Sequence, residues 1–250
     1  DLPLNVPALV IDALLADETR PRLSQFADGF VLNLRGINLN DNADPEDMVS
    51  IRLWCDGKNI VTTRIRRLKA VDDIRHTSAQ NNGPSSASDF ILTLCSSLIH
   101  RMEPTIDKMD ETIALIEENF LDGQKSAGGE SLLTLRRRAV VLKRYMIPQR
   151  DALQLLHSDP LGFLSPTHKQ KLGEALNRLS IYLENLDALK ERAQIIKEEI
   201  AAHANEAMNK NMYMLSIIAA IFLPLGFLTG LLGINIAGIP GAEYPNAFAV

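Results

Sequence analysis

Histidine and cysteine are the side chains of this sequence best suited to metal chemistry, and they are spread thinly along it. Zinc is usually held by three or four such ligands at recognisable spacings. Cys55 and Cys95 lack any CxxC partner, which predicts free thiols in a reducing compartment. No histidine has another four residues away, so we expect surface or helix-capping roles for His76, His100, His157, His168 and His203. No nucleophile elbow, phosphate loop or His-centred constellation occurs, which predicts no enzyme and no cofactor.

A second chemical feature is a long segment without charge. Residues 211–242 contain no Asp, Glu, Lys, Arg or His. About 20 apolar residues span a bilayer as a helix, so we predict a transmembrane helix at 212–232. Pro224 is tolerated there if neighbouring groups satisfy the freed carbonyl, and Gly226 and Gly230 at a spacing of four indicate close helix packing. The alternative is a lone membrane anchor.

Outside this segment the composition is that of a soluble protein. The chain has 250 residues, of which 26 are basic and 31 acidic, giving a net charge of −5. These values exclude a disordered chain or a disulfide-rich miniprotein, and the negative charge argues against a nucleic-acid partner. The sequence lacks an initial Met and a signal segment, so we expect an N-terminally truncated first domain. Residues 246–250 are predicted to start a second, truncated transmembrane helix.

The elements that must position these features begin with a small α/β domain, predicted at residues 1–88. Its expected elements are a helix at 7–26, a strand at 30–37, a hairpin of strands 48–55 and 59–66, and a loop at 78–88. The hairpin rests on apolar–polar alternation around Asp56-Gly57, a dipeptide typical of tight turns.

Antiparallel helices are predicted to fill residues 89–164. A helix at 89–121 carries seven acids between residues 103 and 122 (Glu103, Asp107, Asp110, Glu111, Glu117, Glu118 and Asp122). After a glycine-rich turn at 123–130, a helix at 131–157 carries six bases (Arg136, Arg137, Arg138, Lys143, Arg144 and Arg150). Such neighbours could turn their opposite charges toward one another, or both could be ordinary solvated helix faces.

One long helix is predicted for residues 165–232. Ser165 and Pro166 are typical of an N-cap and a first helical position, and no proline follows until Pro224. The helix would be about 100 Å long at 1.5 Å per residue. Its leucines repeat at spacings of 4 and 3, as in a coiled coil or bundle: Leu172, Leu176, Leu179, Leu183 and Leu186. A helix of this length must run well into the cytosol.

A stripe of uncharged residues runs along one face of this helix and could line an ion path. Its members repeat at spacings of 3 and 4: Met212, Leu215, Ala219, Leu223, Gly226 and Gly230. The stripe offers no tetrahedral set of zinc ligands, so an ion passing along it must keep most of its water. Met212, Leu215 and Leu223 would act as hydrophobic constrictions that gate by dewetting.

Toward the cytosol the same line meets acidic side chains. Heptad steps back from Met212 reach Asn205, Glu198, Glu191 and Glu184. Rings of carboxylate would draw cations; alternatively these are solvated charges, balanced by Lys190, Arg192 and Lys197. His203 lies near this line, where it could bind zinc transiently or titrate if transport is coupled to protons.

The end of the uncharged helix carries a resemblance. Gly233-Ile234-Asn235, following Phe227-Leu228-Thr229-Gly230-Leu231-Leu232, resembles the Gly-x-Asn signature of the CorA superfamily of divalent-cation channels. Ile at the middle position is similar to the ZntB branch, the bacterial zinc transporters. So are the stretches Glu18-Thr19-Arg20-Pro21-Arg22, Lys143-Arg144-Tyr145-Met146-Ile147-Pro148-Gln149-Arg150-Asp151 and Ile234-Asn235-Ile236-Ala237-Gly238-Ile239-Pro240-Gly241. The resemblance covers essentially the whole chain.

The resemblance implies a CorA-like funnel: a homopentamer in the bacterial inner membrane, with the N-terminal α+β domain in the cytoplasm. It places the stripe, together with Asn209, in the pore lining, although Gly226 departs from the hydroxyl residue common in relatives. It places Gly233, Ile234 and Asn235 at the pore mouth, in a periplasmic loop at 233–245. There the amides of Asn235 would bond the hydration shell of a cation, and Glu243 would concentrate cations at the entrance.

Three functions stay open on these grounds. The first is transport of zinc, or of other divalent cations, through the central pore. The second is a magnesium or cobalt channel of CorA type. The third is a membrane-anchored coiled-coil scaffold that transports nothing. Asn235 could also simply cap the pore helix.

Overall fold

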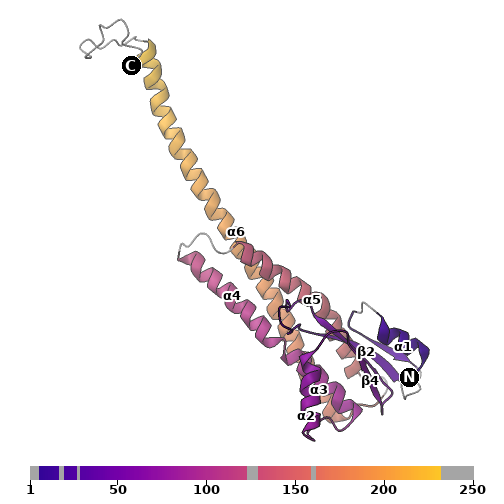
Figure 1. The fold of residues 1–250 in the computed structure, drawn as a ribbon. Helices are drawn as coiled ribbons and strands as arrows, with labels where there is room; N and C mark the ends of the chain where they lie inside the picture. Colours follow the sequence, from indigo (N-terminus) through magenta and orange to yellow (C-terminus); the bar gives the residue numbers. More distant parts are fainter. Residues whose placement is uncertain (1–5, 17–19, 27–28, 123–128, 159–161, 232–250) are drawn as a thin grey trace. The chain divides into compact units, whose positions relative to one another are not determined.

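The computed structural model describes residues 6–16, 20–26, 29–122, 129–158 and 162–231. The chain divides into two units, Asp1–Lys197 and Glu198–Val250. The first contains a four-stranded sheet and most of the helices (Figure 1). The long C-terminal helix begins in the first unit and ends in the second.

The sheet is a simple antiparallel meander. Its strands are β1 (Arg22–Phe26), β2 (Gly29–Gly36), β3 (Val49–Cys55) and β4 (Ile60–Thr63), paired in that order. The predicted strand at 30–37 and the predicted hairpin are confirmed. In the hairpin, a carboxylate oxygen of Asp56 accepts hydrogen bonds from the backbone N–H groups of Lys58 (2.8 Å) and Asn59 (2.6 Å). Gly57 adopts a φ of 90°, a conformation that glycine reaches without strain.

The predicted helix at 7–26 is wrong over its second half. Helix α1 covers only Ala8–Leu15, and β1 follows it. Pro21 disfavours a helical conformation at the residue before it, and β1 gains inter-strand hydrogen bonds by pairing with β2, Leu23 lying opposite Leu32. One face of the sheet packs on α1, whose Val10 and Leu14 are buried in a cluster with Val31 and Trp54.

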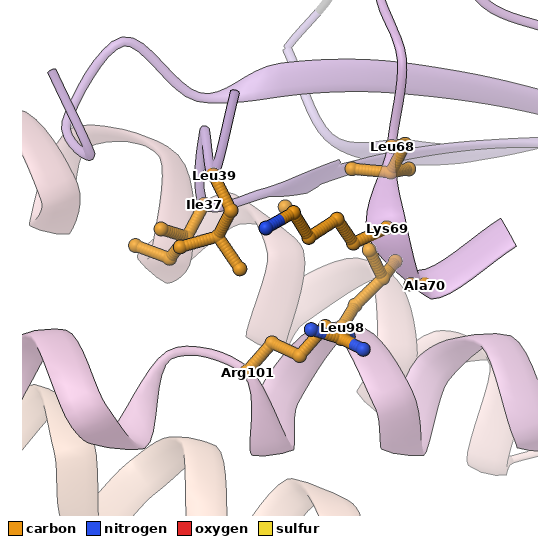
Figure 2. A pocket seen from close by; sticks show the side chains of 8 residues that line it. Ile37, Leu39, Leu68, Lys69, Ala70, Leu98 and Arg101 are labelled. Atoms are coloured by element: carbon orange, nitrogen blue, oxygen red, sulfur yellow. The ribbon is translucent and has the colours of Figure 1, made fainter. Parts of the chain in front are cut away.

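Two further helices lie at the end of β2. Helix α2 (Lys69–Ala79), which was not predicted, precedes α3 (Ala87–His100). Figure 2 shows the small cavity between them and the strand, about 10 Å³, lined by Gly36, Leu68 and Leu98 among others. A Cβ at Gly36 would come within 2.7 Å of Leu98 and 2.9 Å of Leu68, so glycine permits the close approach of both leucines. A cavity of this size holds one water.

The predicted helix at 89–121 is two helices. Helix α3 ends at His100, and α4 (Glu103–Leu121) starts anew with Pro104 in its first turn. Proline has no N–H to continue the hydrogen bonds of a preceding helix, but it fits the first turn of a new one. The predicted loop at 78–88 is shorter than expected, because α2 runs to Ala79 and α3 begins at Ala87.

The remaining helices match the predictions closely. Helix α5 spans Gly129–His157, and α6 spans Pro166–Leu231, which is 66 residues. The hydroxyl of Ser165 accepts the N–H of His168 at 3.2 Å, as expected of an N-cap. All five predicted seam leucines are buried: Leu172, Leu176, Leu179, Leu183 and Leu186. Helices α4 and α5 run along α6 in opposite directions (Figure 1).

Among the described residues no ion pair joins α4 to α5, so the interpretation that their opposite charges meet within one chain was wrong there. Both helices form ion pairs with α6. Arg192 of α6 bonds Asp110 (2.7 Å) and Glu117 (2.6 Å) of α4, and Lys143 of α5 pairs with Asp187 of α6. Asp187 and Arg192 are five residues apart, about 140° around the helix. The two flanks of α6 therefore bind different neighbours.

Candidate functional site: a cation path along α6

The uncharged end of α6 has the properties of a membrane-spanning helix. It is the one helix, among the residues described, that is long and apolar enough to cross a bilayer, and none of its apolar window is buried inside the chain. Met212, Leu215 and Leu223 are exposed by 57%, 66% and 73%. Apolar side chains this exposed require lipid or other protein around them. The span predicted at 212–232 is thus continuous helix up to Leu231.

The predicted pore line falls on one face of this helix. At 3.6 residues per turn its six members lie within an arc of about 80°: Met212, Leu215, Ala219, Leu223, Gly226 and Gly230. Asn209 lies one turn before Met212, at the edge of this face. A Cβ placed on Gly226 or Gly230 would meet nothing within 4 Å. Among the described residues, these two glycines therefore relieve no crowding and leave room for a neighbour.

Two hydroxyl groups in this segment are satisfied by the helix itself. The hydroxyl of Ser216 donates to the carbonyl of Met212 (2.9 Å), and that of Thr229 donates to the carbonyl of Gly226 (3.1 Å). Such back-bonding hides hydroxyl groups in an apolar medium. Pro224 lies inside the helix and removes one backbone hydrogen bond, which a membrane helix tolerates where another group satisfies the carbonyl.

The acids on the cytosolic side of the line are exposed and lie away from the packed seam. Glu184, Glu191 and Glu198 are all exposed. Of the bases considered as their counter-charges, Lys190 lies 3.8 Å from Asp187, and Arg192 is bound to α4. Within the part of the chain that the structure describes, neither Glu184 nor Glu191 has an ion-pair partner. Attraction of cations by these acids stays a prediction.

His203 does not belong to a metal site within one chain. Its Nδ1 lies 4.0 Å from a carboxylate oxygen of Glu206, and both side chains are largely exposed. The described ranges contain no group of three or more His, Cys, Asp or Glu side chains that could hold a metal ion. A metal role for His203 stays a prediction that would need ligands from several copies.

The contacts of His168, His100 and the two cysteines lie within the fold. His168 Nε2 lies 3.1 Å from Asp89 and joins the start of α6 to α3, while His100 lies 3.1 Å from Glu103. Both cysteines are buried and free. Burial raises the pKa of Cys55, and raises the pKa of Cys95 to about 12. Metal binding needs the thiolate, which neither cysteine provides near neutral pH.

One surface feature was missed by the sequence reasoning. An open groove of about 540 Å³ runs between α3 and α6, lined in part by Thr93, Ser96, Lys171 and Arg178. Its two walls lie more than 70 residues apart in the sequence, and no local pattern indicates their contact. The predicted pore mouth, by contrast, is outside the described residues: Gly233, Ile234, Asn235 and Glu243, together with the start of the second helix.

Comparisons with known proteins agree with the predicted family and fold. The family model of the CorA-like Mg2+ transporter protein matches residues 2–250. The divalent cation transporter CmaX of Pseudomonas aeruginosa is 39% identical over 239 residues, covering 95% of this chain and 72% of CmaX. The zinc transport protein ZntB of Pectobacterium carotovorum subsp. carotovorum is 37% identical over 243 residues, covering 97% of this chain and 74% of the relative.

The solved structure of full-length CmaX superposes with a TM-score of 0.85 at 37% identity, covering 98% of this chain and 76% of that one. The likeness confirms the predicted fold class, an α+β domain followed by long helices.

Proposed function

The chain belongs to the CorA-like Mg2+ transporter family, as a ZntB-type member, and on this premise we propose that it carries zinc across the bacterial inner membrane. The observation that carries the proposal is the exposure of the end of α6 together with its distribution of charge. Its last 34 described residues, from 198 to 231, include no buried residue, and their uncharged stripe continues a line of exposed carboxylates. A relative named as a zinc transport protein supports zinc as the ion.

The proposed conducting form is a homopentamer with its sheet domain in the cytoplasm. Five copies of α6 would surround a central path, with Asn209, Met212, Leu215, Ala219, Leu223, Gly226 and Gly230 facing it. Oligomers with closed rotational symmetry give each copy the same environment. The apolar surface of the helix would then be covered by its neighbours and by lipid.

The ion moves through this path largely hydrated. The lining has no charge and no set of close ligands, so it cannot replace the inner shell of zinc. Rings of Met212, Leu215 and Leu223 would close the path by expelling water. Gly233, Ile234 and Asn235 select at the outer mouth, where the amide oxygens accept hydrogen bonds from the water around the ion.

Carboxylates supply attraction at both ends of the path. Glu243 would act at the outer entrance, and Glu184, Glu191 and Glu198 at the cytosolic one. Clefts lined with one sign of charge raise the local concentration of the opposite ion. His203 adds a side chain that binds zinc or protons next to this line, and its contribution rests on five copies meeting at the axis.

Ion flux into liposomes tests the proposal. Liposomes that contain the reconstituted full chain and a zinc-sensitive dye should take up Zn²⁺ in preference to Mg²⁺. Asn235→Ala should abolish uptake, whereas Asn246→Ala, the same change outside the Gly-x-Asn signature, should leave it intact. Uptake of Mg²⁺ alone would replace zinc by magnesium as the substrate. Failure of every divalent ion to enter would favour a scaffold.

A further inference from the structure

The outward faces of α4 and α5 each carry a stripe that is exposed in the part of the chain that the structure describes. On α5 the stripe is Leu133, Arg137, Val140, Arg144 and Ile147, followed by Asp151 and Leu155. Leu133 and Val140 are exposed by 54% and 51%. Apolar residues at spacings of 4 and 3 form the contact seam of paired helices. This seam lies opposite the one that α5 packs into the core.

The stripe on α4 has the opposite charge. It consists of Glu111, Leu115, Glu118 and Asp122, all exposed, with Leu115 at 58%. The acids of α4 that bind Arg192, Asp110 and Glu117, point toward the flank of α6 instead. In the residues described, Glu111 and Glu118 have no ion-pair partner. The outward face of α4 is therefore acidic around one leucine.

The two stripes match at three successive positions when the helices run in opposite directions. Both repeat at spacings of 4, 3 and 4. An antiparallel alignment places Glu111 opposite Arg144, Leu115 opposite Val140, and Glu118 opposite Arg137. Each stripe is then about 16 Å long at 1.5 Å per residue. Glu111 and Glu118 each meet a base, Leu115 meets Val140 between them, and Asp122 falls opposite Leu133 at the end of the stripe.

In the described residues these stripes do not meet within one chain, because both lie on exposed faces of α4 and α5. A rotation about an axis along α6 preserves the direction of each helix, so α4 of one copy stays antiparallel to α5 of the next. Heterologous contacts of this kind close into rings. A contact of α5 with α5 would instead bring Arg137 and Arg144 against their own copies, and like charges disfavour it.

We propose that α4 of one copy docks on α5 of the next through these stripes, which makes the outward faces of the two helices the contact between neighbouring subunits. The partner is a second copy of this chain. The inference rests on the proposed ring, and adds to it the surface that holds the ring together outside the membrane. It also gives a use to the opposite charges of the two helices.

Charge reversal tests the contact in the full chain purified in detergent. Arg137→Glu with Arg144→Glu should weaken association by about tenfold or more, since two attractive pairs become repulsive, as measured by light scattering. Adding Glu111→Arg and Glu118→Arg should restore it. Lys58→Glu with Arg75→Glu, two exposed bases away from the stripe, should have no effect. Thermal melts by circular dichroism check that each variant is folded.

Cross-linking adds a position-specific test. A copy carrying Leu115→Cys and a differently tagged copy carrying Val140→Cys should form a disulfide between them, while Leu115→Cys with Leu155→Cys should not. The contact would be overturned if the variant with Arg137→Glu and Arg144→Glu kept its assembled mass and the two cysteine variants formed no cross-link. The charge-reversed variant could instead keep its assembled mass but lose binding to anionic vesicles. This result would overturn the subunit contact and indicate a membrane-facing surface.

Flux measurements separate this inference from the proposed function. A reversed variant that assembles and conducts zinc would contradict the contact alone. A wild-type chain that assembles and cross-links but conducts no ion would contradict the function alone. A monomeric wild type would contradict both.

Discussion

The two parts of α6 belong to one continuous helix but differ in the burial and the charge of their side chains. In residues 166–197 the apolar side chains form a narrow seam that is buried against α4 and α5, and the other face is charged. In residues 198–231 no side chain is buried, and the last 21 residues carry no charge at all. The first part is stabilised within its own chain, whereas the second exposes its apolar side chains.

Truncating a buried leucine should have the largest effect. Leu186 is fully buried, so Leu186→Ala should lower the free energy of unfolding by about 3 kcal/mol through lost burial and a cavity. Leu223→Ala, the same change in the exposed part, should leave this value within about 0.5 kcal/mol. Trp54, the only tryptophan, reports unfolding of the first unit by fluorescence. Equal losses at both sites would break the contrast between the two parts.

The ion pairs on the flank of α6 should contribute less. Arg192→Met removes both pairs with α4 and should cost about 1 kcal/mol, because the side chains are partly exposed to solvent. Lys190→Met removes only the 3.8 Å contact with Asp187 and should have almost no effect. Denaturant unfolding of the two variants measures the difference. A larger cost for Lys190→Met would contradict the assignment of the α4 flank to Arg192.

Removing the carboxylates on the exposed face should change transport but not folding. Glu184→Gln with Glu191→Gln should reduce zinc uptake about two- to threefold at low ionic strength, and less in salt, which screens the attraction. Glu174→Gln, an acid of α6 off the line, is the control. A salt-independent loss, or an equal loss in the control, would show that these acids do not attract the ion.

A pH dependence at the start of α6 should be the smallest effect. Hydrogen bonds from Ser85 and Ser86, together with His168, hold the pKa of Asp89 below its ordinary value. A carboxyl with a lowered pKa stabilises the fold above its unfolded pKa of about 4, and this contribution is lost as pH falls through the folded value. Asp89→Asn should therefore flatten the dependence of the unfolding midpoint on pH between 3 and 5. An unchanged slope, equal to that of the control Asp12→Asn, would contradict it.

Local patterns predicted the parts of this fold that local patterns determine. The start of α6 at Pro166 was predicted from a capping serine and proline, and its seam from the repeat of leucines. The hairpin followed from alternation around Asp56-Gly57. The uncharged segment identified the membrane helix by composition alone.

What the sequence did not reveal depends on contacts between distant residues. Strand β1 exists because it pairs with β2, so its own residues were mistaken for helix. The break between α3 and α4 did carry a local signal, Pro104, which the prediction of one helix overlooked. Helix α2 is short, with few apolar positions. The charges of α4 and α5 gave no indication of which partner they would bind, because Arg192 lies 75 residues beyond Glu117.

The central claim is that one face of α6 lines the path of the ion. It is tested by inhibiting zinc uptake with a thiol reagent that reacts with an introduced cysteine. Leu215 lies on the proposed line, and Ile217 lies about 160° around the helix from it. Both native cysteines are buried and unreactive, so a cationic, membrane-impermeant thiol reagent should reach only an introduced cysteine. The reagent should stop uptake by Leu215→Cys and leave uptake by Ile217→Cys unchanged. Equal inhibition of both variants, or of neither, would contradict the account.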